Sequence, residues 1–293
     1  MSSTYIVLRS VGTTPPCKPE LKLLNVSSDD NVDDPIDFVS KDLFSVLIPE
    51  EYVGIGLNRI YHCNGIFCLY DCVMAYDTIT LFNPAIKESK RLPKSNFAGA
   101  LDTWREINFN IEVDDLFSFS TEYINGVFFW LVETPDYMII SFDMCDEVFH
   151  SISIPGDHQS ASSRPMLGLW NESLAVIYTF YAEDDDSIFS EIWAMDNCYE
   201  SVNGSCSWNK VYTFEPLLDL RGLGSFRNNL FVIRNSGGSL FSYNFRSQKF
   251  REIVIDRSNH IIYWSLSYVK SLVSMQMHNG VTWRVGPLRC IGM

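Results

Sequence analysis

The sequence predicts an all-β protein, a β-propeller of short antiparallel sheets, on three observations. Helical periodicity is nearly absent over the 293 residues, and short apolar runs alternate with turn residues, which is typical of many short strands. Aromatic residues make up 14% of the chain and suit a pleated, half-buried surface. A similar run of strands and turns also recurs four times. Recurrence every ~40 to 50 residues indicates sheets stacked around an axis, and we expect roughly six such blades.

The four repeats share one order of signals. A turn with Asn or Gly leads into an apolar strand, a polar turn leads into a second strand that ends at Asp, Asn or Pro, and a third strand closes the repeat. A small sheet of this kind cannot bury both faces alone, so stacking is expected. The repeats span residues 64–93, 124–155, 169–212 and 226–255.

The rest of the chain completes a single domain over residues 1–293 in this interpretation. Closing a propeller requires a pairing between its ends, so we expect the strand at 5–8 to pair with the last strands, near 264–275. Polar insertions are expected to form loops on the outside of the sheets. They lie at residues 27–37, 96–115, 183–186 and 197–207.

The formal net charge of -14 limits the possible partners. Nucleic-acid binding depends on Lys and Arg that displace counterions from phosphates, so DNA and RNA are not expected as partners. A basic protein target is favoured, because complementary charge speeds the encounter of two proteins. Negative charge also keeps an aromatic-rich protein in solution, and the composition leaves this alternative open.

The sequence also lacks signals of secretion, membrane insertion and metal binding. No basic and apolar leader follows Met1, and no apolar run is long enough to cross a bilayer, so the sequence predicts a soluble, cytoplasmic protein without membrane contact. The eight cysteines form no C-x-x-C pair. His62 beside Cys63 resembles a ligand pair, yet cysteine packs well as a small hydrophobe. No metal and no cofactor are therefore expected.

The candidate partner-binding residues are two dense acidic groups in the expected loops. Loops on a rigid scaffold often carry binding residues, and an acidic rim would attract a basic ligand. A solvated acidic loop without a binding role is the alternative. The first group is Glu183, Asp184, Asp185 and Asp186, and the second is Asp29, Asp30, Asp33 and Asp34.

An enzyme is not expected. The sequence contains no nucleophile elbow, zinc-protease motif or phosphate-binding glycine loop, and its five histidines are scattered. A propeller glycosidase or lyase with paired carboxylates remains the catalytic alternative. A deep polar pocket with two close carboxylates would indicate such an enzyme.

Several motifs resemble one known family. The runs 62–69 (HCNGIFCL), 81–88 (LFNPAIKE) and 91–93 (RLP) look like the opening of plant F-box-associated, kelch-like domains. Residues 140–155 are similar to the second repeat of that family, and residues 167–210 contain segments similar to its third. Together the motifs cover roughly residues 60 to 255.

The S-locus F-box subgroup is the most similar group that these motifs indicate. The resemblance implies a target-recognition domain of an SCF-type ubiquitin ligase, with S-locus ribonucleases as targets in pollen self-incompatibility. Members of the family normally begin with a helical F-box that binds a Skp-type adaptor and cullin, and no such segment precedes Tyr5 here. We therefore expect target binding, with ligase recruitment only if an F-box is supplied. A scaffold that competes with complete relatives is the alternative.

Overall fold

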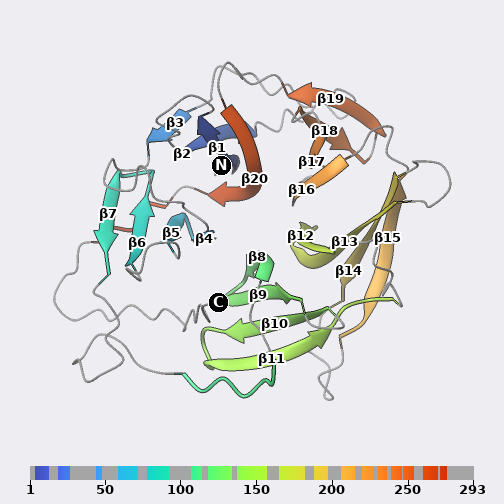
Figure 1. Ribbon diagram of the computed structural model, residues 1–293, viewed down its shortest axis with the longest axis horizontal. Coiled ribbons are helices and arrows are strands. Elements are labelled where there is room, and N and C mark those ends of the chain that lie inside the picture. Colours follow the sequence, from blue (N-terminus) through green and yellow to red (C-terminus); the bar gives the residue numbers. More distant parts are fainter. Residues whose placement is uncertain are drawn as a thin grey trace. The chain divides into compact units, whose positions relative to one another are not determined.

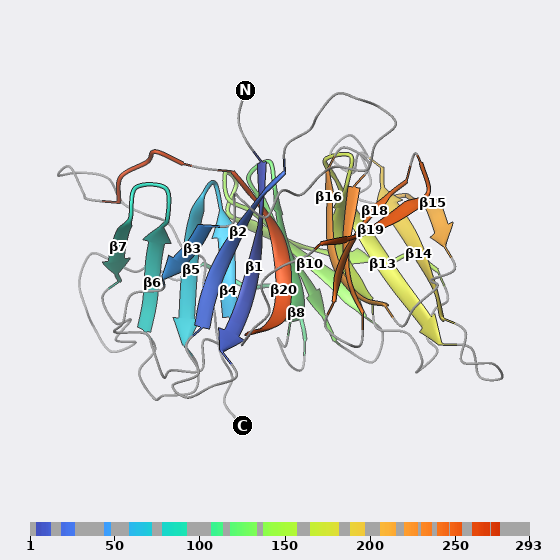
Figure 2. The ribbon, with the colours of Figure 1, turned by 90° about the horizontal axis from the view of Figure 1, so that it is seen from above.

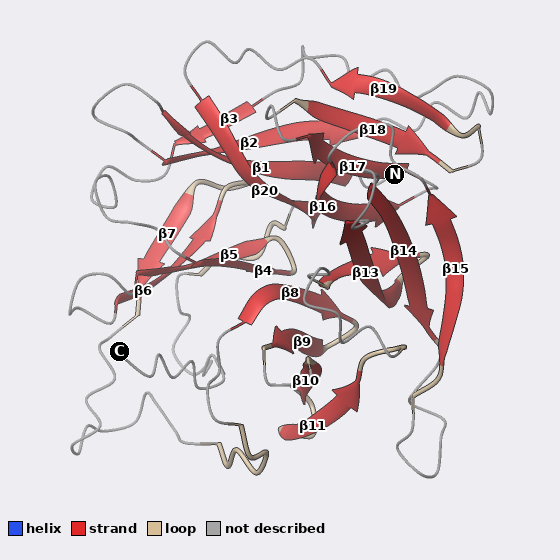
Figure 3. Cartoon of the chain, turned by 45° about the vertical axis from the view of Figure 1, so that its right-hand side comes forward, coloured by secondary structure: helices blue, strands red, loops and turns tan. Residues whose placement is uncertain are grey.

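The computed structural model describes five antiparallel sheets of four strands each, and the described residues contain no helix (Figures 1 and 3). We name them sheets A to E. The described residues are 4–12, 19–26, 44–47, 59–71, 78–92, 107–113, 118–133, 137–156, 165–181, 188–196, 206–214, 220–227, 230–235, 239–245, 247–253, 260–269 and 271–275.

Contacts divide the chain into two compact units. The first holds sheets A and B, formed within residues 1–27, 36–108 and 255–293, and the second holds sheets C, D and E, formed within residues 109–254. Each unit is described by itself below. The expectation of one domain over residues 1–293 stays a prediction.

Sheet A pairs the first strand with the last one. Its order is β20-β1-β2-β3, so β1 has a hydrogen-bonded neighbour on both sides. The antiparallel register of β1 and β20 places Tyr5 opposite Tyr268. The pairing predicted between the two ends of the propeller is therefore confirmed. The strands are β1 (Thr4–Gly12), β2 (Pro19–Val26), β3 (Phe44–Leu47) and β20 (His260–Val269).

Sheet B contains the first sequence repeat. The strands β4 and β5 are joined by Asn64 and Gly65, whose φ angles of 46° and 78° are both positive. Two-residue hairpins need this conformation at both positions, which is why Asn-Gly predicts them. The strands are β4 (Arg59–Cys63), β5 (Ile66–Asp71), β6 (Thr78–Asn83) and β7 (Glu88–Arg91).

Sheets C, D and E contain the other three repeats. Sheet C has β8 (Ser118–Ile124), β9 (Val127–Val132), β10 (Met138–Asp143) and β11 (Val148–Ser153). Sheet D has β12 (Met166–Trp170), β13 (Ser173–Tyr181), β14 (Ile188–Met195) and β15 (Trp208–Phe214). Sheet E has β16 (Leu220–Arg227), β17 (Leu230–Asn235), β18 (Leu240–Asn244) and β19 (Lys249–Ile253).

The all-β, β-propeller class is confirmed, and one detail of the repeat is corrected. The sequence predicted three strands in each repeat, whereas sheets B to E each have a fourth strand before the turn that opens the predicted repeat. In β8 the polar run Ser-Phe-Ser-Thr-Glu hides this strand from a search for apolar runs. The described residues form five sheets, and the expected count of roughly six blades stays a prediction.

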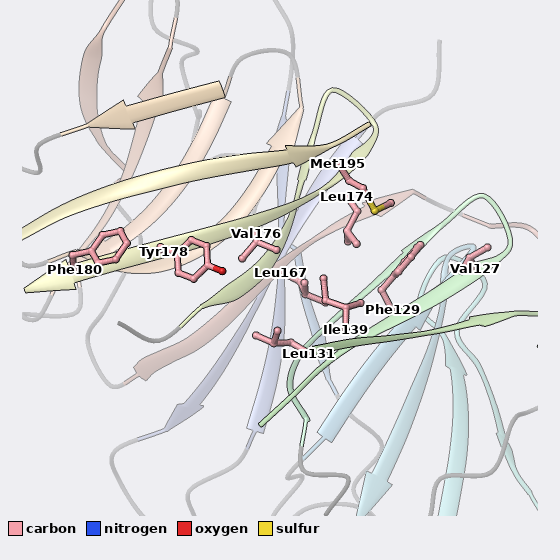
Figure 4. Packing of buried hydrophobic residues seen from close by; sticks show 10 residues of the cluster. All are labelled: Val127, Phe129, Leu131, Ile139, Leu167, Leu174, Val176, Tyr178, Phe180 and Met195. Carbon is pink, nitrogen blue, oxygen red and sulfur yellow. The ribbon is translucent and has the colours of Figure 1, made fainter. Parts of the chain in front are cut away.

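Strand β13 shows how the sheets of the second unit pack. Its side chains alternate between two faces because the side-chain period of a strand is two. Val176 and Tyr178 join a buried cluster with Phe129 and Ile139 of sheet C (Figure 4). Ala175 and Ile177 join another cluster with Phe231 and Tyr243 of sheet E. Sheet D is therefore buried on both faces.

Hydrogen bonds reinforce this packing between neighbouring sheets. The Tyr178 hydroxyl donates to the carbonyl of Pro155 at 2.8 Å, and the indole N–H of Trp208 donates to the carbonyl of Ser153 at 2.9 Å. Trp193 and Trp208 are partly buried and pack against the cluster between sheets C and D, as expected for residues that contribute to the packing between blades.

Candidate functional site

The turns between the third and fourth strands of three sheets share one local structure. Asn83 in sheet B, Asp143 in sheet C and Asn244 in sheet E each accept hydrogen bonds from backbone N–H groups two or three residues later. Each turn also has a residue with positive φ four residues after the Asn or Asp. The side chain that ends the third strand therefore folds the turn that follows it.

In each of sheets B to E, the turn between the first and second strands lies at the same end as the turn between the third and fourth strands, because neighbouring strands are antiparallel. In sheet C, the Met144 N–H donates to the carbonyl of Gly126 at 3.1 Å and ties the two turns together. The hydroxyl of Ser120 on β8 bonds both the N–H and the carbonyl of Leu167 on β12. The first strands of sheets C and D, β8 and β12, therefore lie side by side near Ser120 and Leu167.

We call the turns at this end the turn end of sheets C and D. In the residues that the structure describes, these turns contain five carboxylates and no lysine, arginine or histidine. The five residues are Asp143, Asp146, Glu147, Glu172 and Asp196. A surface of this composition attracts a positively charged partner.

The five carboxylates do not have equal roles. Asp143 caps its own turn, and the Asp196 carboxylate accepts hydrogen bonds from the Ser207 hydroxyl and the Asn209 amide at 3.1 and 2.7 Å. These two carboxylates are occupied with local structure. Asp146 and Glu172 are also exposed to solvent.

Glu172 stands at a position that favours glycine. Gly65 and Gly126 occupy it in sheets B and C, whereas Glu172 has a φ of 68° in sheet D. A side chain in the left-handed region costs ~1 kcal/mol or more relative to glycine. Retaining a strained, charged residue at the tip of a hairpin is typical of a functional position.

An ion pair in sheet D, between Glu191 and Lys210, has a structural role. Glu191 is buried and accepts hydrogen bonds from the Lys210 ammonium at 2.9 Å and from the indole N–H of Trp193 at 3.0 Å. The Lys210 ammonium also lies 5.3 Å from the centre of the Trp193 ring. Burial and then the negative charge of Glu191 raise the pKa of Tyr178. This paired, packed arrangement orders the sheet.

His62 has a structural role in sheet B. Its Nε2 accepts a hydrogen bond from the Gly65 N–H at 3.0 Å, and burial lowers the pKa of its imidazole to about 4. Burial also raises the pKa of the Cys68 thiol to about 12, which suits packing as a small hydrophobe. No group of three metal-ligating side chains occurs within the described ranges.

The described cysteines differ in their bonding state. Cys63, Cys68 and Cys145 are thiols outside any disulfide, while Cys206 is disulfide-bonded, which the sequence did not predict. Across the part of the chain that the structure describes, no helix is long and apolar enough to span a membrane.

The predicted partner-binding residues all lie outside the described residues, so their role stays a prediction. They are Glu183, Asp184, Asp185, Asp186, Asp29, Asp30, Asp33 and Asp34. The acidic turn end is a different set of residues that the sequence analysis did not single out. The sequence indicated part of this surface, because the second predicted strand of each repeat, which is the third strand of the observed sheet, was expected to end at Asp, Asn or Pro.

The fold is that of an all-β propeller. A family model described as "F-box associated beta propeller domain" matches residues 96–275. The chain belongs to this F-box-associated β-propeller family. Domains of this kind are typically protein-interaction modules rather than catalysts, which supports the expectation that the chain is not an enzyme.

Solved structures similar to this chain have low sequence identity. Apo AztD from Citrobacter koseri is 10% identical over 92% of this chain and 99% of its own, with a TM-score of 0.40. The N-terminal domain of Nup159 is 11% identical over 83% of this chain and 62% of its own, with a TM-score of 0.29.

A chain of an S. cerevisiae complex of Dbp5, Nup159, Gle1, IP6 and ADP is 10% identical over 83% of this chain, with a TM-score of 0.30. The present chain spans 61% of that structure. No curated protein matches this chain in sequence.

Proposed function

We propose that this chain is the substrate-recognition part of an SCF-type ubiquitin ligase and that its target is a basic protein. The match of the F-box-associated family model to residues 96–275 carries the proposal. The acidic turn end of sheets C and D supports a basic target, because charge complementarity speeds encounter and disfavours other partners. In this role the propeller binds the target and performs no chemistry.

The finer proposal is that the target is an S-locus ribonuclease and that the chain acts in the cytoplasm of pollen. Its support is the resemblance of the motifs at residues 62–93 to the S-locus F-box subgroup. A basic ribonuclease also has the charge that the net charge of -14 would attract. A Skp-type adaptor and cullin are expected to join only through an F-box.

The test is a titration of the purified chain with a basic S-locus ribonuclease, followed by calorimetry at rising salt. We expect the dissociation constant to rise roughly tenfold between about 50 and 200 mM salt, because screening weakens attraction between exposed charges. The double variant Asp146→Asn, Glu172→Gln should bind about fivefold more weakly, because it removes two exposed charges. It keeps Asp143 and Asp196, whose hydrogen bonds hold the turns.

Two further variants decide between the possible surfaces. Glu112→Gln with Glu133→Gln removes the same charge from exposed positions outside the turn end and should leave affinity nearly unchanged. Changing Asp184, Asp185 and Asp186 to Asn tests the loop predicted from the sequence. Equal losses in all three variants would indicate a general charge effect. Absence of binding to any such ribonuclease would reject the S-locus target and leave an interaction propeller of another specificity.

A further inference from the structure

The segment Ser271–Met275 of the first unit lies on the β6–β7 hairpin of sheet B (Figure 2). We call it the strap. The buried Asn83 amide donates to the carbonyl of Ser271 at 3.1 Å and to the carbonyl of Val273 at 2.9 Å. Its Oδ1 accepts from the Ala85 N–H at 3.0 Å, which fixes the amide. One side chain therefore binds two carbonyls of the strap backbone.

Glu88 binds the other end of the strap. Its carboxylate accepts hydrogen bonds from the Ser274 hydroxyl at 3.1 and 2.9 Å, and from the Met275 N–H at 2.8 Å. Bonds to an ionised acceptor are about twice as strong as neutral ones. Met275 is 1% exposed, so its side chain is buried and helps to hold this end of the strap.

The residues between these anchors contribute little side-chain packing. Leu272 is 84% exposed and Val273 is 52% exposed. The hairpin thus bonds two carbonyls, the Ser274 hydroxyl and the Met275 N–H of the strap, and the Met275 side chain is buried. Main-chain bonds of this kind give affinity to sites that bind an extended peptide, and side chains of the peptide give selectivity.

Equivalent hairpins lack the same pair of groups. The Asn83–Glu88 pair of sheet B corresponds to Asp143 and Val148 in sheet C, and to Asn244 and Lys249 in sheet E. An ionised Asp cannot donate to a carbonyl, and neither Val nor Lys can accept from a peptide N–H. Turn formation needs only the first residue, so Glu88 is not explained by the turn itself.

We propose that the β6–β7 hairpin is a peptide-binding site for an extended segment in which methionine follows serine, and that the strap fills it in cis. A partner protein with such a segment exchanges with the strap when the strap detaches. A short non-strand segment held at the surface opens more readily than a core strand, which gives a partner access. The β6–β7 hairpin lies outside residues 96–275, which the family model matches, and the strap forms the last five of those residues. The proposed site does not depend on the target proposed above.

The test measures whether a separate fluorescent peptide of residues 268–278 can replace the strap on the hairpin of the full chain. In one variant of the chain, Ser274→Ala and Met275→Ala weaken the strap while sheet B stays intact. We expect this variant to bind the peptide at least tenfold more tightly than the wild type, by fluorescence anisotropy. Adding Glu88→Gln should reduce that binding about tenfold, because the neutral amide is a weaker acceptor.

Changes in the peptide provide controls that cannot affect folding of the protein. The peptide with Met275→Ala should lose most of its affinity, whereas the peptide with Leu272→Ala should bind as the original does, because Leu272 is exposed in the strap. A weakened-strap variant that keeps its circular dichroism spectrum but binds no peptide would overturn the proposal. Equal binding of the Met275→Ala peptide would overturn it as well.

Discussion

Burial shifts the pKa of two single residues, Glu122 and His62, toward the neutral form. Burial raises the pKa of Glu122, on the innermost strand of sheet C, to about 8. It lowers the pKa of His62 to about 4. In both residues the neutral form is favoured, because a low-dielectric environment penalises the charged one. These groups therefore link the stability of their sheets to pH.

Glu122→Gln should stabilise the protein in alkaline solution. With a pKa of about 8, Glu122 keeps its proton in the folded state up to about that pH, whereas the unfolded chain releases it near the ordinary glutamate pKa of 4.5. The free energy of unfolding therefore falls as pH rises through this window, and the loss is complete above it. We expect the variant to melt about 2 to 4 °C higher at pH 9, and about equally at pH 4.

Melting of both proteins by calorimetry between pH 4 and 9 checks this prediction. Glu133→Gln, which removes an exposed carboxylate at the end of β9, is the matched control and should follow the wild type at every pH. A Glu122→Gln curve parallel to the wild-type curve would show that Glu122 is ionised in the folded state at neutral pH.

Individual hairpins are controlled by the backbone conformation of their turns. Asn125 and Gly126 have φ angles of 47° and 93°, and a Cβ built on Gly126 meets no atom within 4 Å. An alanine at this position would be strained by the positive φ of its own backbone and would not collide with neighbouring residues. The strand pairing of the whole sheet thus depends on a position where glycine is favoured for conformation alone.

Opposite substitutions at the equivalent turn positions should have opposite effects. Gly126→Ala should lower the free energy of unfolding by about 1 kcal/mol, and Glu172→Gly should raise it by about 0.5 to 1 kcal/mol, because φ is positive at both residues. Urea unfolding followed by tryptophan fluorescence measures both changes. Glu172→Ala, which removes the charge and keeps the strain, is the control and should not stabilise. Stabilisation by Glu172→Ala would mean that charge repulsion, not φ, weakens this hairpin.

At the scale of the whole chain, the two ends fold together in sheet A. Val7 of β1 pairs with Leu23 of β2 on one side and Leu266 of β20 on the other. Proline at this position removes a donor from the interior of the sheet. Although Val7 is far from residues 260–269 in sequence, both belong to one hydrogen-bonded sheet. A substitution that breaks the hydrogen bonds of β1 should therefore also weaken the protection of backbone amides in β20.

Val7→Pro should destabilise the first unit by about 3 kcal/mol and speed amide hydrogen exchange throughout β20. Exchange mass spectrometry of the peptide covering residues 260–269 gives the measurement. Val7→Ala keeps the backbone donor and separates the loss of the side chain from the loss of the hydrogen bond. Unchanged exchange in β20 would mean that β1 is dispensable for the order of sheet A.

The sequence predicted the strands and turns well where one local signal decides them. Asn64-Gly65 predicted a hairpin because both residues tolerate positive φ, and Trp193 and Trp208 were expected in the core. The innermost strand β8 was missed, because its residues are largely polar and its place in the sheet comes from pairing with β9. The acidic turn end was missed because Asp146, Glu172 and Asp196 are distant in sequence.

The sequence by itself determined an acidic, all-β repeat protein, since side-chain alternation, turn chemistry and net charge are local or additive properties. Only the tertiary structure decided which residues meet. It turned Asn83, expected only to end a strand, into a donor to two carbonyls 188 and 190 residues away. It also brought the acidic turns of sheets C and D to the same end. Such contacts depend on register and stacking between sheets, which no local pattern encodes.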